Sequence, residues 1–221
     1  MKIINIAIDG PAAAGKSTIS RRVAGRLNYM YIDTGAMYRS VTLYALNHGT
    51  EQMFDNLNRI DIRFKNEDSG NQRVLLNNED VTEAIRSKEV TANVSKVASY
   101  EAVRTYLVNM QQQLADEKGI VMDGRDVGTT VLPDAELKIF MQASPKVRAE
   151  RRLIEERERG NQVDLETLTK QIMERDEFDM SREISPLVQA EDAFLLDTSE
   201  MTIEEVESCI IKLALEKVEG E

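Results

Sequence analysis

Short apolar runs alternate with amphipathic segments along most of the chain. The first run, residues 3–8, is continuous and rich in β-branched side chains, which is typical of a strand buried on both faces of a sheet. The next segment places Ile19, Val23 and Leu27 at the spacing of one helix face. Four more apolar runs lie beside helix-like segments, at residues 30–32, 119–122, 137–141 and 193–196. The pattern predicts an α/β fold with a five-stranded parallel sheet flanked by helices.

Two helix starts are marked by capping residues. Ser144 is followed by Pro145, which combines an N-cap side chain with proline at the first helical position. Thr202 and Glu205 have the spacing of a capping box and precede a further amphipathic stretch. We therefore expect helices to begin near these two caps, and the second helix to close the domain.

The pattern changes within the first half of the chain. Two alternating segments, residues 60–64 and 73–76, flank the turn-rich stretch 66–71, which is typical of an antiparallel hairpin. We therefore expect a small antiparallel insertion within an otherwise parallel fold. The expected domains are a core made of residues 1–33 and 103–221 and an insertion at residues 34–102.

Composition and charge narrow the classes of function. The chain has 28 Lys and Arg against 39 Asp and Glu, and its net charge of −11 argues against general binding to nucleic acid. No stretch approaches the ~20 apolar residues that cross a bilayer. With one cysteine and one histidine, the chain has no pair for an internal disulfide and no zinc cluster. We expect a cytoplasmic monomer that binds neither membranes nor nucleic acid.

Residues 10–17 match the pattern G-x-x-x-x-G-K-[ST] between the first apolar run and a helical segment. Gly10 and Gly15 let the backbone wrap closely, so that N–H groups and a helix N-terminus point at a phosphate. Lys16 is placed to reach β- and γ-phosphates, and Ser17 to offer its hydroxyl to Mg²⁺. The motif predicts binding of nucleotide phosphates, but it does not separate a transferase from a switch.

A carboxylate and several arginines extend this candidate site. Asp123 follows an apolar run, where an acid can hold Mg²⁺ or its water shell, although a lone carboxylate there is usually a turn residue. The arginines that stand at element ends, with Asp126 and Asp179 beside them, are Arg39, Arg104, Arg125, Arg175 and Arg182. A single arginine would be read as a surface ion pair. The guanidinium makes bidentate contacts with phosphate, so the set favours phosphoryl transfer to a small acceptor.

Four segments together resemble the bacterial cytidylate kinases, which belong to the nucleoside monophosphate kinases of the P-loop fold. They are residues 10–18, 33–39, 123–129 and 174–182, the last followed by Ser185-Pro186-Leu187. Asp-Gly-Arg-Asp-Val-Gly-Thr, at 123–129, is the most specific of them. The resemblance implies transfer of the γ-phosphoryl group of ATP to CMP and dCMP, with Mg²⁺ as the cofactor. It also implies that the insertion binds the monophosphate.

The resemblance implies roles for individual residues. ATP binding is implied for Gly10, Pro11, Ala12, Ala13, Ala14, Gly15, Lys16, Ser17 and Thr18. Binding of Mg²⁺, through water, is implied for Ser17 and Asp123. CMP binding is implied for Thr34, Arg39, Ser95, Arg104, Arg125, Asp126, Arg175, Asp179 and Arg182. Catalytic roles are implied for Lys16, Asp123, Arg125, Arg175 and Arg182.

The CMP set divides by the chemistry of its ligand. Thr34, Arg39, Arg125 and Arg182 stand at the acceptor-phosphate positions, Ser95, Arg104 and Asp126 at the base, and Arg175 and Asp179 at the sugar. Ionised Asp126 can only accept hydrogen bonds, so it favours the cytosine amine and repels O4 of uracil. Thr34 replaces the serine of many relatives and still supplies a hydroxyl.

A mobile lid at residues 150–165 is also implied by the resemblance. The arginines on the helix that leads into it are Arg148, Arg151, Arg152, Arg157 and Arg159. Their spacing does not say which of them reaches the ATP phosphates. Closure of such a segment excludes water during transfer.

Two alternatives stay open. A P-loop kinase for another small acceptor, such as a different nucleotide or a metabolite like shikimate, has the same fold. A nucleotide-dependent binding switch shares the phosphate loop, but the chain has no guanine-reading Asn-Lys-x-Asp motif. Phosphorylation of a free monophosphate separates the enzyme from the switch.

Overall fold

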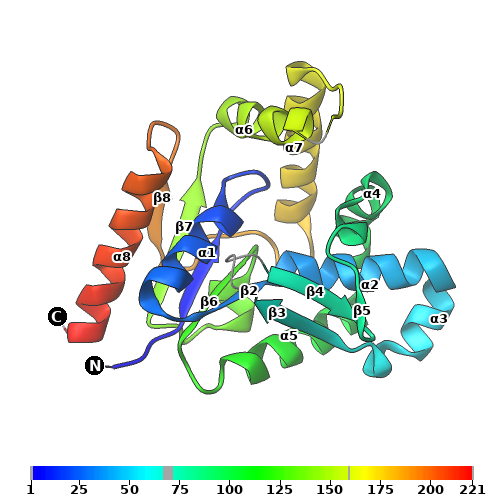
Figure 1. Ribbon diagram of the computed structural model, residues 1–221, viewed down its shortest axis with the longest axis horizontal. Coiled ribbons are helices and arrows are strands. Elements are labelled where there is room, and N and C mark those ends of the chain that lie inside the picture. Colours follow the sequence, from blue (N-terminus) through cyan, green and yellow to red (C-terminus); the bar gives the residue numbers. More distant parts are fainter. Residues whose placement is uncertain (1, 67–71, 159, 221) are drawn as a thin grey trace. The chain divides into compact units, whose positions relative to one another are not determined.

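The computed structural model describes residues 2–66, 72–158 and 160–220 (Figure 1). Arg159 and the expected turn residues 67–71 lie outside the described residues. Within them, no helix is both long enough and apolar enough to cross a membrane.

A five-stranded parallel sheet forms the centre of the core, as the sequence predicts. Its strands are β1 (Ile6–Asp9), β2 (Met30–Asp33), β6 (Ile120–Gly124), β7 (Leu137–Gln142) and β8 (Phe194–Asp197), in the order β2-β6-β1-β7-β8. The central strand β1 pairs in parallel with both β6 and β7, and β7 pairs in parallel with β8. Residues of β1 are buried along its whole length, which explains its continuous apolar sequence.

Two helices pack side by side against this sheet. They are α1 (Lys16–Leu27) and α8 (Ile203–Glu219), and Figure 1 shows them in blue and red. Ile19 and Val23 of α1 share one apolar cluster with Ile210 of α8 and with the strand residues Ile6 and Ile139. The helical face expected from the sequence is therefore the face that packs on the sheet.

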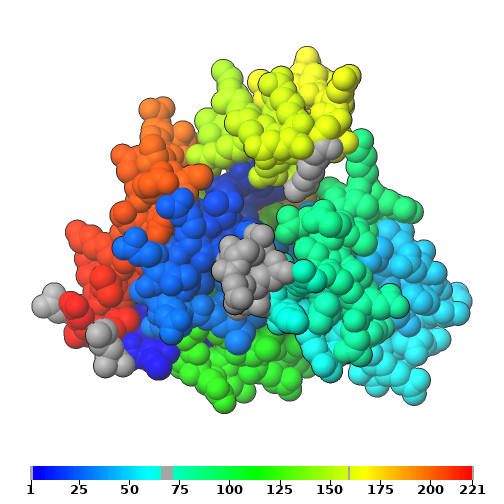
Figure 2. All heavy atoms as spheres, viewed as in Figure 1, coloured from blue at the N-terminus to red at the C-terminus, as the bar shows by residue number. Residues whose placement is uncertain are grey.

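A second pair of core helices, α6 (Pro145–Glu158) and α7 (Leu165–Ser181), packs around Ala149, Leu168 and Ile172. In Figure 2 this pair, coloured yellow-green to yellow, forms one continuous surface. The helix α6 begins at Pro145, and the Ser144 hydroxyl accepts a hydrogen bond from the N–H of Val147 at 3.3 Å, as the sequence predicts.

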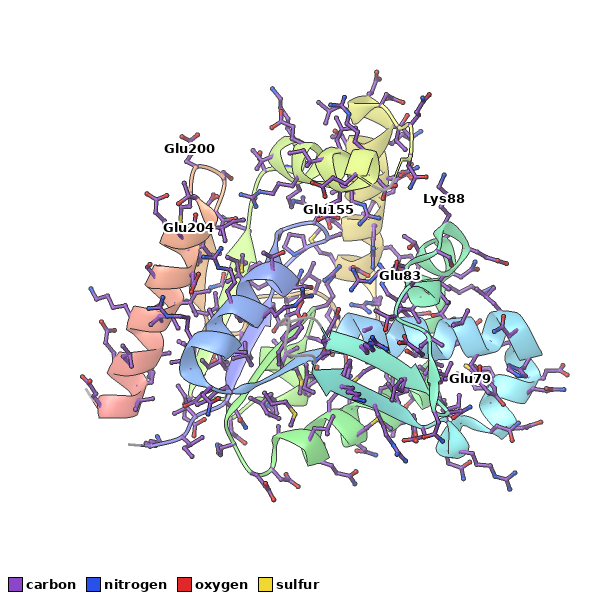
Figure 3. The ribbon with its side chains drawn as sticks, viewed as in Figure 1. Glu79, Glu83, Lys88, Glu155, Glu200 and Glu204 are labelled. Carbon is purple, nitrogen blue, oxygen red and sulfur yellow. The ribbon has the colours of Figure 1, made fainter. Side chains whose placement is uncertain are left out.

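The capping box of α8 is also present. The Thr202 hydroxyl accepts from the N–H of Glu205, and the Glu205 side chain accepts from the N–H of Thr202. Glu204, labelled in Figure 3 near the start of α8, pairs with Arg22 of α1 at 3.1 Å. The core also contains a single π-helical turn between β6 and β7, η3 (Val127–Val131).

The rest of the chain builds a second unit with its own small sheet. Its elements are α2 (Thr34–His48), α3 (Thr50–Asp55), η1 (Leu57–Arg59), β3 (Ile62–Asn66), β4 (Gln72–Leu76), β5 (Glu79–Asp80), η2 (Ala84–Arg86), α4 (Lys88–Val97) and α5 (Glu101–Ala115). The strands β3, β4 and β5 are antiparallel, with Phe64 opposite Val74. Glu79 of β5 and Lys88 at the start of α4 are labelled in Figure 3.

The chain folds as two compact units, Met1–Tyr31 with Glu117–Glu221 and Ile32–Asp116. The sequence interpretation assigns residues 103–116 to the core, whereas the structure groups α5 with the second unit. The reason is packing, because α5 contacts α2 and η1, Leu107 is fully buried, and the Tyr106 hydroxyl donates to the carbonyl of Ile60 at 2.6 Å.

Two glycine substitutions test how tightly β1 is enclosed. Gly10 follows β1 with φ +150°, and a Cβ there would lie 2.0 Å from the carbonyl oxygen of Met141 on β7. We expect Gly10→Ala to lower the free energy of unfolding. Backbone strain alone costs about 1–3 kcal/mol, and the close contact with Met141 adds to that cost. Gly25→Ala, on the exposed side of α1 with nothing within 4 Å, should raise the free energy of unfolding by about 0.5–1 kcal/mol. Urea unfolding measures both; equal stability of Gly10→Ala and the unmodified protein would contradict the close approach.

Candidate functional site

The loop between β1 and α1 turns sharply back on itself. Gly10, Ala13 and Gly15 all have positive φ, at +150°, +58° and +88°. Gly15 is the N-cap of α1 and provides no side-chain acceptor for the first helical N–H groups. These groups and the partial positive charge of the helix N-terminus are therefore available to an anion. Figure 2 shows the surface hollowed between the blue N-terminal segment and the α6–α7 pair.

Lys16 lies at the base of this loop and is buried. Its Nζ donates to the carbonyl of Pro11 at 2.8 Å, which spans the loop from one end to the other. Burial, and next the charge of Arg125, lower the pKa of Lys16 to about 7, against the opposing effect of Asp123. An anion in the loop would reverse this shift, because it stabilises the charged amine.

Ser17 of α1 and Asp123 of β6 form a hydrogen bond within the core unit. The Ser17 hydroxyl donates to Oδ2 of Asp123 at 2.9 Å, and the hydroxyl of Tyr31 donates to Oδ1 at 2.8 Å. Hydroxyl and carboxylate oxygens are hard ligands that suit Mg²⁺, which commonly takes one or two protein carboxylates together with substrate phosphates. Among the described residues, no group of three or more His, Cys, Asp or Glu side chains is placed to hold a metal ion.

Two residues of this edge escaped the sequence interpretation. Tyr31 fixes the carboxylate of Asp123, and Asp9 accepts from the N–H groups of Val127 and Gly128 at 2.8 and 2.7 Å. Burial raises the pKa of Asp9 to about 6, despite these two hydrogen bonds. The sequence feature that could have identified Asp9 is its position, because it is a carboxylate at the end of a buried strand. Asp9 holds the start of η3, and so the segment that carries Asp126, to the end of β1.

Three of the predicted arginines gather around one buried carboxylate. Arg125 donates to Asp179 from Nε at 2.9 Å, and Nη2 of Arg182 lies 4.0 Å from the other oxygen. Although burial would raise the pKa of Asp179, Arg125, Arg175 and Arg182 hold it below its usual value. Arg125 and Arg175 also lower the pKa of Lys16, which places this cluster within electrostatic reach of the phosphate loop.

The second unit holds four of the residues predicted to bind CMP, Thr34, Arg39, Ser95 and Arg104. Thr34 is buried at the first position of α2, where the Asp33 carboxylate caps the helix by accepting from the N–H of Ala36. Arg39 donates to the hydroxyl of Thr91 at 2.9 Å, and Ser95 lies one helical turn further along α4.

Arg104 is buried in the same unit. Its Nη1 donates to the carbonyl of Ala98 at 3.2 Å, and its guanidinium lies 5.3 Å from the centre of the Tyr38 ring. The cation–π contact and the hydrogen bond hold the guanidinium in place. Arg104 is thus a preoriented donor, as recognition of a base would need.

The arginines expected near the lid have different partners. Arg148 and Arg151 donate to carbonyls of the phosphate loop, those of Ala12 and Ala14, at 2.9 and 3.2 Å. Arg152 pairs with Glu155, labelled in Figure 3, and with Glu156. Arg148 and Arg151 therefore contact the loop itself, which the spacing of the arginines did not reveal.

The chain is similar to known proteins in sequence and in fold. The family model described as Cytidylate kinase matches residues 6–216. An uncharacterized protein from Eubacterium ventriosum is similar in structure at 12% identity, with a TM-score of 0.55 and 99% of each chain covered. TT1252 from Thermus thermophilus is similar at 14% identity, with a TM-score of 0.51 and 99% of each chain covered. A shikimate kinase from Bacteroides thetaiotaomicron, 13% identical, gives a TM-score of 0.49 over 97% of this chain and 99% of its own.

The pKa of Lys16 leads to a measurable proton uptake. At about pH 8 the amine, with its pKa near 7, is mostly neutral, and the phosphates of ATP should recharge it. We expect MgATP binding to take up about one proton at that pH and much less at about pH 6. Calorimetry in two buffers of different ionisation enthalpy measures the uptake, and permanently charged Lys16→Arg is the control. Identical heats in both buffers at pH 8 for the unmodified protein would refute the shift.

Proposed function

This chain belongs to the cytidylate kinase family, and we propose that it transfers the γ-phosphoryl group of ATP to CMP and dCMP. The observation that carries the proposal is the arginine cluster around Asp179, which acts electrostatically on Lys16 of the phosphate loop. A loop for one phosphate chain with arginines for a second phosphate beside it is what phosphoryl transfer between two nucleotides requires.

The donor side rests on the loop between β1 and α1. The N–H groups at the start of α1 and the amine of Lys16 would hold the β- and γ-phosphates of ATP. Ser17 and Asp123 would hold Mg²⁺, directly or through water, and the ion would neutralise charge on the phosphates. Tyr31 keeps the Asp123 carboxylate in one orientation for that purpose.

The resemblance assigns the phosphate of CMP to Arg125, Arg182, Thr34 and Arg39. Three guanidinium groups and a hydroxyl suit a dianion. The carboxylate of Asp179 orients Arg125 and Arg182. It would also accept hydrogen bonds from the ribose hydroxyls, and Arg175 would donate to them.

The base would be read by Asp126, Arg104 and Ser95. Asp126 is buried, and an ionised carboxylate there accepts from the N4 amine of cytosine but repels the O4 of uracil. Arg104, held beside the Tyr38 ring, would donate to O2 or N3 of the base. Discrimination follows because the wrong base leaves a buried polar group unpaired.

Transfer itself needs no covalent intermediate on this protein. In-line attack of a CMP phosphate oxygen on the γ-phosphorus depends on position and on neutralisation of charge. Lys16, Arg125, Arg175 and Arg182 supply that charge. Closure of the segment 150–165 would exclude water, which otherwise competes as the acceptor.

The test is ADP release from MgATP with CMP, dCMP, UMP, AMP and GMP as separate acceptors, and with Lys16→Ala as the blank. Turnover mainly with the cytidine nucleotides supports the proposal. Turnover with another monophosphate, or with a metabolite, keeps the kinase and rejects the base assignment. Slow hydrolysis that no acceptor changes would favour a binding switch.

Asp126→Asn tests the reading of the base. The amide presents both a donor and an acceptor, so it can satisfy the O4 of uracil as well as the amine of cytosine. We expect the ratio of kcat/KM for CMP over UMP to fall by about tenfold or more. Asp134→Asn, at an exposed carboxylate of the core unit, is the matched control and should leave the ratio unchanged. The same ratio in Asp126→Asn and the control would remove Asp126 from the site.

A further inference from the structure

The tip of the phosphate loop is held by a buried ion pair from α6 and α7. The N–H of Ala12 donates to Oδ1 of Asp176 at 3.2 Å, and the carbonyl of Ala12 accepts from Nη1 of Arg148 at 2.9 Å. Arg148 and Asp176 are themselves 2.6 Å apart, and all three residues are buried. One ion pair therefore satisfies both backbone groups of one loop residue.

Stability alone does not account for this arrangement. A buried ion pair loses the hydration of two charges, so its net contribution to stability is close to that of apolar residues of the same size. What the pair does provide is a fixed position. Nε of Arg148 also donates to the carbonyl of Ala143 at 2.9 Å, which ties the guanidinium to the chain that follows β7. The loop is thereby anchored to the sheet through Arg148.

Arg151 holds the loop a second time, two residues further on. Its Nη1 donates to the carbonyl of Ala14 at 3.2 Å, and its Nη2 donates to the carbonyl of Thr198 at 2.6 Å. Ala13, between the two bound carbonyls, has φ +58°, a conformation that alanine adopts only under constraint. The two arginines supply that constraint.

The direction of the bound carbonyls sets the direction of the N–H groups. In a planar trans peptide the C=O of one residue and the N–H of the next point in opposite directions. Because the carbonyls of Ala12 and Ala14 point to α6, the N–H groups of Ala13 and Gly15 point away from it. These are N–H groups of the loop that would bind phosphate.

We propose that Arg148 and Asp176, assisted by Arg151, are positioning residues that orient the N–H groups of the phosphate loop before ATP binds. The inference rests on the proposed function only for its donor, ATP, and does not depend on the acceptor. Arg148 and Arg151 then act on ATP through the loop instead of through the phosphates. A loop oriented in advance loses less conformational entropy on binding, and this raises affinity.

The experiment compares Asp176→Asn with Glu207→Gln. Glu207 is a buried carboxylate of the same unit that pairs with Arg22 between α1 and α8, outside the site, so it is a matched control. The Kd of MgATP is measured by calorimetry without any acceptor, at a temperature where circular dichroism shows both variants folded. We expect a rise in Kd of about tenfold or more for Asp176→Asn and less than about twofold for Glu207→Gln. In turnover, KM for ATP should rise while KM for CMP stays unchanged.

A second variant keeps the test decisive if Asp176→Asn does not fold. Arg148→Met with Asp176→Leu removes both charges together and leaves no unpaired charge in the interior, so we expect it to fold. It should bind MgATP as weakly as Asp176→Asn. A Kd within about twofold of the unmodified protein, in whichever of these variants folds, would overturn the proposal. So would an equal loss in Glu207→Gln.

The outcomes also separate this inference from the proposed function. An unmodified protein that binds MgATP but phosphorylates no cytidine nucleotide contradicts the proposed acceptor and leaves the positioning role intact. Binding of MgATP that is the same with and without the ion pair contradicts the positioning role alone. If the unmodified protein does not bind MgATP, both are wrong.

Discussion

The chemistry of this molecule depends on the place of β1 at the centre of its sheet. Because β1 pairs in parallel with β6 on one side and β7 on the other, its carboxyl end lies between the carboxyl ends of these two strands. The register sets Ile8 opposite Asp123, and Asp9 opposite both Gly124 and Phe140. The phosphate loop, the carboxylate of Asp123 and the segment that carries Arg125 therefore start from adjacent points of one sheet edge.

Charge in the site is organised by contacts within the protein. Lys16 donates to the carbonyl of Pro11, Arg125 to Asp179, and Arg148 to both Asp176 and Ala12. In a chain of net charge −11, these pairs keep cations oriented at one place. The donors of such a site are already oriented toward a phosphate. Water molecules would have to reorient around the same charge, and the site avoids the free-energy cost of that reorientation.

Local signals predicted much of the fold. The apolar face of α1, the start of α6 at Pro145 and the capping box of α8 follow from neighbouring residues, and the structure confirms them. The phosphate loop was equally visible, because Gly10, Gly15 and Lys16 lie within one short stretch of the sequence. The contacts of Asp9, Tyr31 and Asp176 were not, since each joins residues far apart in the sequence; Ala12 and Asp176 are separated by 164 positions. The grouping of α5 with the second unit likewise depends on packing that periodicity does not report.

The order of the units along the chain has a consequence for synthesis. The second unit, Ile32–Asp116, is continuous, whereas the core is made of the segments before and after it. As the ribosome releases the chain, β1 and α1 emerge before the second unit, whereas β6 and β7, the neighbours of β1 in the sheet, emerge only after that unit. The apolar strand Ile6–Asp9 is therefore unpaired during the time in which the second unit can already fold through its own local contacts. Nascent chains are therefore most open to misassociation during that interval, when a strand made for burial on both faces is still exposed.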